Sequence, residues 1–333
     1  MIVDDSTFVR RAVRRMLAAD PELDVVGEAA DGPSALREVD RLAPDVVTLD
    51  LRMPGLDGVE TLESMMETRP TPVVLLSSYA QADAALTLRA LAAGAVDFVD
   101  KSRVSAMDVY RLAPELVAKL KAAAAARRRS HGPAGWLAPP PSVPPRLVVL
   151  GASTGGPKAI EAVLAALPAA SRFAVLVVQH LPAGFTAAFA RRLAGACALP
   201  VDEVVAGRPL RPGTVAVVPG GSDASFDADG AVQIAPGTGR ALPRIDVTLA
   251  SAAACYGAAA CAVILTGMGR DGVDGARRIR AAGGAVVAEA ASTCAVYGMP
   301  RAIVDEGLAT CVAPIDEIAA VIGRLAALPG GAP

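Results

Sequence analysis

Short apolar runs alternate with amphipathic segments along the first third of the chain. The runs at 25–28, 46–49, 73–77 and 96–99 have the length and the valine and leucine content of strands, and the segments between them have the apolar spacing of helices. Such alternation is typical of a parallel sheet covered by helices on both faces. We therefore expect a doubly wound α/β domain.

The same alternation resumes beyond residue 146. The expected strands lie near 147–150, 174–178, 214–218, 262–265, 285–288 and 309–312. Residues 226–230 have the composition of a turn and precede the apolar run 231–234, which predicts a hairpin insert. The pattern indicates a second doubly wound, Rossmann-like α/β domain, and no internal repeat relates it to the first.

The segment between the two regions has a different composition. Residues 119–145 are rich in alanine, arginine and proline, which favours extended polyproline conformations and gives no apolar face for a core. We expect a first domain at 1–118, a flexible linker at 119–145, a second domain at 146–328 and a disordered tail at 329–333.

Composition limits the class of protein. The chain has 333 residues, of which 53% are hydrophobic, so it is long enough for two cores. Charges or glycines interrupt its apolar stretches before they reach the roughly 20 residues of a spanning helix, and the first residues lack the pattern of a secretion signal. We expect a cytoplasmic protein without direct membrane insertion.

Charge and cysteine content exclude two further classes of site. The net charge is −2, so there is no overall basic field that would indicate nucleic-acid binding. The five cysteines are widely spaced in the second half without a Cys-x-x-Cys pair, and the chain has only two histidines. We interpret the cysteines as buried thiols rather than metal ligands.

Polar residues follow the predicted strands of the first domain. Asp4 and Asp5 end the first apolar run, Asp50 ends the run at 46–49, Ser77 ends the next, and Lys101 follows the last. The carboxyl ends of parallel strands share one edge, where ligands bind. Clustered carboxylates suit Mg²⁺ together with a phosphoryl oxygen, and Asp50 could then accept a phosphoryl group.

These residues and the segment 50–58, Asp-Leu-Arg-Met-Pro-Gly-Leu-Asp-Gly, closely resemble the receiver domain of bacterial response regulators. The resemblance implies a flavodoxin-like fold, Mg²⁺ as cofactor and a sensor histidine kinase as phosphodonor. It also implies these roles: Asp4 and Asp5 as the acidic metal site, Asp50 as phosphoacceptor and metal ligand, the Arg52 carbonyl as a further ligand, Ser77 and Phe98 as the switch pair, and Lys101 as the phosphate partner.

A small nucleophile stands in a glycine turn at the start of the second domain. Gly151-x-Ser153-x-Gly155 lies between a predicted strand and a helix, whose N-terminal N–H groups favour an oxyanion. A serine nucleophile needs a base, and His180 is the one histidine outside the linker, where His131 lies. A phosphate-binding loop is a weaker alternative, because Pro157-Lys158 replaces the required Lys-Ser/Thr. A purely structural turn is also weaker, because His180 and Asp271 stand in equivalent positions after predicted strands.

The carboxylate of such a triad must follow the histidine in the chain. Between the serine and the histidine there is no aspartate, and Glu161 falls inside the predicted helix. Asp271 is the best placed candidate, because it lies in a glycine-rich loop after the strand at 262–265. Asp246 and Asp274 are its competitors.

Several motifs identify the second domain by resemblance. Gly-Ala-Ser-Thr-Gly-Gly-Pro at 151–157, Gln-His-Leu-Pro at 179–182, Leu-Thr-Gly-Met-Gly-Arg-Asp-Gly at 265–272 and Tyr-Gly-Met-Pro-Arg at 297–301 resemble the chemotaxis protein-glutamate methylesterases. The resemblance covers residues 146–328. It implies Ser153 as nucleophile, His180 as base, Asp271 as orienting acid, the Met268 N–H as an oxyanion donor and Thr154 as a residue that lines the site.

The same resemblance implies a function. It is the hydrolysis of glutamyl methyl esters on methyl-accepting chemoreceptors with release of methanol, with deamidation of receptor glutamines as a second activity. No cofactor is expected for the hydrolase step, and phosphorylation of the receiver would relieve inhibition of the hydrolase. A non-hydrolytic signalling adaptor is the alternative, whereas a transcriptional regulator is disfavoured because the second half lacks a helix-turn-helix pattern and a basic helix.

Overall fold

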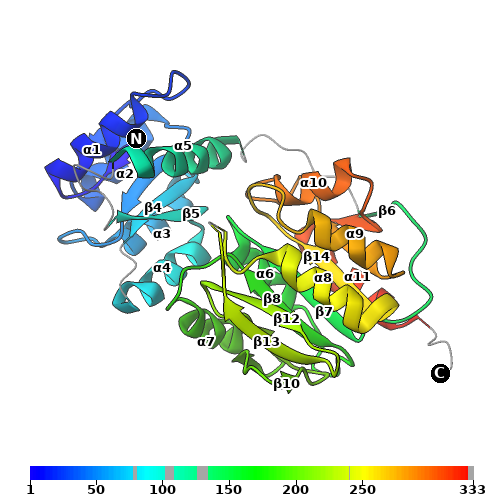
Figure 1. Cartoon of the computed structure of the whole chain (residues 1–333). Coiled ribbons are helices and arrows are strands. Elements are labelled where there is room, and N and C mark those ends of the chain that lie inside the picture. The colour runs from blue at the N-terminus through cyan, green and yellow to red at the C-terminus, as the bar shows by residue number, and fades with distance from the viewer. Residues whose placement is uncertain (78–80, 102–108, 126–133, 240, 329–333) are drawn as a thin grey trace. The chain divides into compact units, whose positions relative to one another are not determined.

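The computed structural model describes residues 1–77, 81–101, 109–125, 134–239 and 241–328. The chain forms two compact units, Met1–Arg128 and Arg129–Pro333, and each is described by itself (Figure 1). The predicted tail 329–333 and His131 lie outside the described residues. Among the described helices, none has both the length and the apolar character needed to cross a membrane.

The first unit is built on a five-stranded parallel sheet with the order β2-β1-β3-β4-β5. Its strands are β1 (Ile2–Val3), β2 (Glu28–Ala29), β3 (Val47–Asp50), β4 (Val73–Ser77) and β5 (Asp97–Asp100). Its helices are α1 (Thr7–Leu17), α2 (Gly32–Leu42), α3 (Gly58–Thr68), α4 (Gln81–Ala93) and α5 (Val109–Ala125). This order is that of the flavodoxin-like doubly wound fold, which confirms the prediction.

Local sequence fixes where these helices begin. The Ser6 hydroxyl accepts a hydrogen bond from the Val9 N–H at the start of α1. Asp57 and Glu60 form a reciprocal capping box at the start of α3. Because α3 begins there, the loop after β3 is short and Asp50 stays at the edge of the sheet.

The second unit contains an eight-stranded sheet with the order β6-β16-β15-β14-β7-β8-β11-β9. Its strands are β6 (Gly135–Trp136), β7 (Leu147–Ala152), β8 (Ala174–Gln179), β9 (Val201–Glu203), β11 (Val215–Val217), β14 (Ala260–Ile264), β15 (Ala285–Glu289) and β16 (Cys311–Ala313). All its neighbouring pairs are parallel except β6 with β16. The order of the chain reverses between β7 and β14, where ligands bind in sheets of this kind.

Helices cover both faces of this sheet (Figure 1). One group of helices, which pack on one another, comprises α6 (Gly156–Ala165), α7 (Thr186–Ala196) and α11 (Ile315–Ala326). The other group comprises α8 (Ile245–Tyr256), the short 3-10 helix η3 (Gly257–Ala259), α9 (Val273–Ala281) and α10 (Met299–Asp305). The apolar faces of α8, α9 and α10 and the valines and leucines of the strands form a large buried cluster. Helices on both faces of a mainly parallel sheet confirm the predicted α/β class.

The predicted hairpin is also confirmed. Strand β12 (Ser222–Phe226) pairs antiparallel with β13 (Ala231–Pro236), and β10 (Arg208–Pro209) adds a third strand. Phe226 contacts Tyr256 of α8 edge to face, at 5.2 Å between ring centres, so the hairpin packs on the main domain. It therefore covers α8, whose first residues belong to the site described below.

Several element boundaries differ from the sequence prediction. The strand expected at 25–28 is a two-residue strand at Glu28–Ala29, because it pairs with a β1 that is itself two residues long. Helix α5 continues past residue 118 to Ala125, and its Leu120 and Ala123 belong to the first core. Within the expected linker, β6 pairs with β16, and Arg324 of α11 lies 6.0 Å from the Trp136 ring.

Candidate active site

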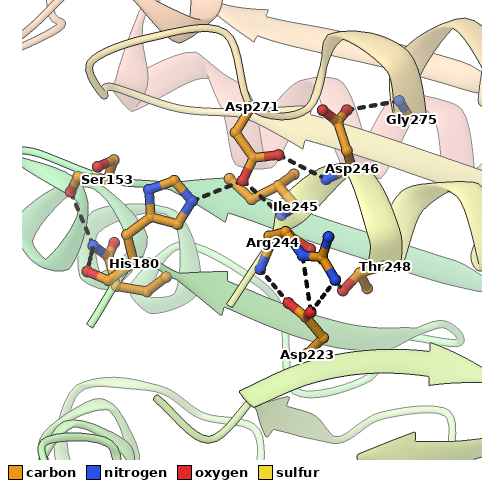
Figure 2. Close-up of polar contacts among 10 residues, drawn as sticks. Ser153, His180, Asp223, Arg244, Ile245, Asp246, Thr248, Asp271 and Gly275 are labelled. Atoms are coloured by element: carbon orange, nitrogen blue, oxygen red, sulfur yellow. Dashed lines mark hydrogen bonds and ion pairs between the residues drawn. The ribbon is translucent and has the colours of Figure 1, made fainter. Parts of the chain in front are cut away.

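Three polar side chains come together at the carboxyl ends of the central strands of the second unit (Figure 2). Ser153 follows β7, His180 follows β8, and Asp271 lies in the loop between β14 and α9. Because β14, β7 and β8 are neighbours in the sheet, residues distant in the sequence meet at the point where the strand order reverses.

The turn that carries Ser153 is held by its backbone. The Ser153 N–H donates to the Thr266 carbonyl at 3.0 Å, and the Gly156 N–H donates to the Ser153 carbonyl at 2.8 Å. Gly155 has a φ of +78°, and a Cβ at this position would lie 2.5 Å from the Ala295 Cβ. The turn thus requires glycine, and it places Ser153 directly before the N-terminus of α6, where backbone N–H groups are unpaired.

The imidazole of His180 lies between the serine and the aspartate. Its Nε2 donates to Asp271 Oδ2 at 2.8 Å, and its other nitrogen, Nδ1, faces Ser153 (Figure 2). Within the described residues the Ser153 hydroxyl makes no hydrogen bond, so it is free to bond to Nδ1 once a substrate orders it. The geometry therefore assigns Nδ1 as the nitrogen that can take the serine proton.

Two backbone N–H groups at the start of α8 hold Asp271. Ile245 N donates to Oδ2 at 2.8 Å and Asp246 N donates to Oδ1 at 2.9 Å. Burial alone would raise the pKa of Asp271, but hydrogen bonds from His180 and from these N–H groups outweigh it and lower the pKa. The carboxylate therefore stays ionised and accepts a proton-bearing Nε2.

The competing aspartates have other partners. Asp246 accepts a hydrogen bond from the Gly275 N–H at 2.8 Å, and Asp274 forms a surface ion pair with Arg277 at 2.6 Å. Burial raises the pKa of Asp246, which also disfavours its ionised form. Of the three candidates, the structure brings Asp271 to His180.

The Met268 N–H is placed as a candidate oxyanion donor. Gly267 lies against the serine, since a Cβ there would be 2.8 Å from the Ser153 Cβ. In the described part of the chain the next N–H group, that of Met268, donates to no acceptor. An unpaired N–H beside the nucleophile is what an oxyanion site needs.

Thr154, which is expected to line the site, is buried at 4% exposure. Its carbonyl accepts a hydrogen bond from Thr266 Oγ1 at 2.9 Å. Thr154 therefore joins the serine turn to the loop after β14.

Sequence analysis missed two groups that support the triad. The Gln179 amide donates from Nε2 to the Ser153 carbonyl at 2.9 Å and to the His180 carbonyl at 3.1 Å. Asp223 accepts the Arg244 N–H at 2.9 Å and its guanidinium Nε–H at 2.8 Å, which fixes the residue directly before α8 (Figure 2). A polar residue at the end of an apolar strand is the sequence signal for Gln179, but nothing in the sequence pairs Asp223 with Arg244.

A cavity of about 370 Å³ adjoins this site. Arg244, Arg270 and Asp271 are among the residues that line it. The cavity thus carries charged groups of both signs next to the aspartate that contacts His180.

The strand ends of the first unit form an acidic cluster. One carboxylate oxygen from each of Asp4, Asp5 and Asp50 lies within 4.8 Å of the others. Lys101 Nζ is 2.5 Å from Asp50 Oδ2 and 2.9 Å from Asp4 Oδ2. Burial raises the pKa of Asp50 and of Asp4, although Lys101 partly offsets it. Hard oxygen donors around a buried carboxylate fit a Mg²⁺ ion, which would relieve the repulsion among them.

The predicted switch residues lie on β4 and β5. Ser77 Oγ is 2.7 Å from Thr87 Oγ1 of α4. Phe98 is buried, its carbonyl accepts a hydrogen bond from Lys119 Nζ at 2.6 Å, and the same ammonium lies 5.6 Å from its ring centre. Each switch residue therefore contacts a helix that follows it in the chain.

Arg52 lies two residues after Asp50, the last residue of β3. Its N–H donates to Asp50 Oδ1 at 3.3 Å, and its guanidinium forms an ion pair with Asp83 in the first turn of α4. The backbone of Arg52 is thus adjacent to the acidic cluster, as the predicted metal-ligand role of its carbonyl requires.

Comparisons with known proteins agree with this geometry. Residues 148–322 match the CheB methylesterase family, and residues 1–107 match the response regulator receiver domain family. A protein-glutamate methylesterase/protein-glutamine glutaminase from Symbiobacterium thermophilum is 45% identical over 97% of this chain and 96% of that protein. A protein of the same description from Pseudomonas aeruginosa is 41% identical over 99% of this chain and 97% of its own length.

A solved structure supports the fold of the second unit. The Thermotoga maritima CheB methylesterase catalytic domain is 38% identical, with a TM-score of 0.52, over 55% of this chain and 100% of that one. The family match covers more than half of the chain, and the alignments with the two relatives span nearly all of it. The chain therefore belongs to the CheB methylesterase family, with a response regulator receiver domain ahead of the methylesterase domain.

Proposed function

We propose that this chain is a phosphorylation-activated methylesterase that acts in the cytoplasm on methyl-accepting chemoreceptors. It hydrolyses glutamyl methyl esters to glutamate and methanol, and it deamidates glutamines at the same kind of position. The observation that carries the reaction type is the 2.8 Å bond from His180 Nε2 to Asp271, with Nδ1 facing Ser153. Family membership supports the substrate class.

In the first half of the reaction, Ser153 Oγ attacks the ester carbonyl while His180 Nδ1 takes its proton. Asp271 stabilises the imidazolium through Nε2–H, and the Met268 N–H donates to the oxyanion. The tetrahedral intermediate collapses with the C–O bond to methanol breaking, and His180 returns the proton to that oxygen. An acyl-enzyme on Ser153 remains.

In the second half, a water molecule attacks the acyl-enzyme while His180 again takes a proton. The bond to Ser153 Oγ breaks, His180 reprotonates the serine, and the glutamate carboxylate is released. With a glutamine side chain the leaving group is ammonia instead of methanol, and the other steps are the same.

For the receiver, we infer that Asp50 accepts a phosphoryl group from a chemotaxis-type histidine kinase. Asp4, Asp5 and Asp50, with the Arg52 carbonyl, would hold Mg²⁺, whose chemistry there is to neutralise phosphoryl oxygens. Lys101 would pair with the phosphoryl group on Asp50, and the contact of its Nζ with the Asp50 carboxylate supports this role. Phosphorylation then relieves inhibition of the hydrolase.

The direct test is methanol release from a methylated receptor, with and without a small phosphodonor. The parent chain should release methanol, and faster with the donor. Ser153→Ala should lower the rate by several orders of magnitude while leaving the fold intact, because a triad nucleophile is lost. A rate for this variant above about a tenth of the parent rate would place the nucleophile elsewhere. A folded parent without turnover would favour the adaptor alternative.

A further inference from the structure

Glu289 is a buried carboxyl group next to the triad that the mechanism above does not use. It is the last residue of β15 and is 1% exposed. Its Oε2 accepts a hydrogen bond from the Thr266 N–H at 2.8 Å, and its Oε1 accepts one from Thr293 Oγ1 at 3.0 Å. Across the described residues it forms no ion pair. Burying a carboxyl without a cation is costly, so its place there calls for an explanation.

Thr266 connects Glu289 to the serine turn. The Thr266 carbonyl accepts the Ser153 N–H at 3.0 Å, and its hydroxyl donates to the Thr154 carbonyl at 2.9 Å. One residue therefore separates Glu289 from the backbone of the nucleophile. A shift of Thr266 would move the serine turn with it.

Thr266 also begins the segment that leads to the oxyanion donor. Gly267 follows, and its N–H donates to the Val296 carbonyl at 3.0 Å. Since Gly267 lies against Ser153, the Met268 N–H has little freedom once Thr266 is fixed. The hydrogen bond from Thr266 to Glu289 thus fixes both the serine and the donor.

The charge on Glu289 bears on the same site. The groups that face it are neutral: the Thr266 N–H, the Thr293 hydroxyl and the Cys294 thiol. Burial raises the pKa of Glu289 to about 7, although these hydrogen bonds oppose the shift. A carboxylate in this low-dielectric position repels an oxyanion that forms near Met268, whereas the neutral acid does not.

We propose that Glu289 is a positioning residue that holds the Thr266–Met268 backbone against the Ser153 turn and so sets the oxyanion site. The neutral acid is the form that supports the reaction, because its Oε2 still accepts the Thr266 N–H without adding a negative charge. Its proton then lies on Oε1 and is donated to Thr293 Oγ1, whose own proton is donated to the Ala290 carbonyl. The inference rests on the proposed esterase function. It adds a falling alkaline limb to the pH profile of the reaction.

The test compares full-length Glu289→Gln with the parent, using methanol release from about pH 5 to about pH 9. The amide oxygen can accept the same Thr266 hydrogen bond, but the side chain cannot ionise. The variant should keep the parent kcat at pH 6 to within about twofold and lose the fall above pH about 7. Thr293→Val is the comparison variant, because it removes the Oε1 contact while leaving the Thr266 contact. Its alkaline limb should remain but with a shifted midpoint, because the hydroxyl contributes to the pKa of Glu289.

A second variant separates positioning from charge. Glu289→Ala leaves the Thr266 N–H without its acceptor, and kcat should fall by about 10- to 100-fold with KM changed less than about threefold. If Glu289→Ala does not fold, the pH profile of Glu289→Gln alone tests the proposal. A Gln profile that superimposes on the parent profile at every pH overturns the proposal. A parent chain that releases no methanol contradicts the proposed function instead, so the two failures are distinct.

Discussion

Asp271 differs from Asp246 and Asp274 in what its carboxylate contacts. It accepts two backbone N–H groups at the start of α8 and one imidazole N–H, whereas the others contact a backbone N–H of α9 and a surface arginine. A carboxylate at a helix N-terminus is stabilised by the unpaired N–H groups and by the helix dipole. Asp271 is thereby kept ionised and oriented toward His180.

Asp271→Asn tests this assignment. The asparagine side chain has one oxygen that can accept, whereas the Asp271 carboxylate accepts three N–H groups. The His180 Nε2–H therefore loses its acceptor, or the imidazole takes the tautomer with its proton on Nδ1. We expect kcat to fall by about 10³- to 10⁴-fold, with a small residual rate. Esterase activity is the measurement, and unchanged thermal unfolding shows that the fold is retained.

Asp246→Asn is the matched control, because an asparagine oxygen still accepts the Gly275 N–H. Its rate should stay within about tenfold of the parent rate, since it does not contact the histidine. If the Asp246 or Asp274 variant proved slower than Asp271→Asn, the assignment of the acid would be wrong.

The candidate site residues could be predicted from the sequence where they stand in a recognisable motif. Ser153 and His180 stand in turns after apolar strands, and the one ambiguity, the acid, arose because three aspartates lie near the ends of predicted elements. Glu289 and Gln179 each end an apolar strand, but the sequence does not indicate which groups they contact. Their contacts depend on which strands are neighbours and on side-chain direction at the strand ends, and single-sequence patterns contain neither.

At the scale of elements, the carboxyl edge of each parallel sheet determines what its loops can do. In the first unit this edge collects Asp4, Asp50 and Lys101 from β1, β3 and β5, which are separated by long stretches of sequence. The alternation of strands and helices was therefore enough to predict this cluster.

Asp50→Asn should abolish labelling of the chain by a small phosphodonor, because an amide cannot accept a phosphoryl group. Removal of Mg²⁺ by a chelator should do the same to the parent chain, since phosphoryl charge in an acidic cluster needs a cation. The measurement is incorporation of phosphate into the intact protein by mass. Asp40→Asn, at an exposed position on α2, is the control and should be labelled as the parent is. Labelling that survives in Asp50→Asn would point to Asp4 or Asp5.

Short elements were the least predictable part of the fold. Strand β6 has two residues within a proline-rich segment, and it forms because the edge of β16 is open to pairing and because Trp136 lies near Arg324. Helix α5 extends beyond residue 118, into the predicted linker, because its Leu120 and Ala123 pack in the first core. In both cases a tertiary contact overrides local composition.

At the scale of the whole molecule, two compact units with separate chemistry share one chain. The receiver offers a phosphorylation site, and the methylesterase domain offers the reaction that phosphorylation would control. The boundary for separating them follows from the fold. A truncated chain should begin at Ala134 rather than near Arg146, because β6 at Gly135–Trp136 is part of the second sheet.

This truncated chain should hydrolyse a small soluble ester faster than the unphosphorylated full chain, and phosphorylation of Asp50 should bring the full chain toward the same rate. A phosphoryl group adds about two negative charges and several acceptor oxygens, enough to bias an inhibitory contact by roughly tenfold or more if each new hydrogen bond contributes about 1 kcal/mol. The measurement is kcat/KM for the truncated, resting and phosphorylated proteins. Asp50→Asn treated with the phosphodonor is the control and should stay at the resting rate. Equal rates for all three proteins would mean that the receiver leaves the active site open throughout and serves to bring the enzyme to its kinase.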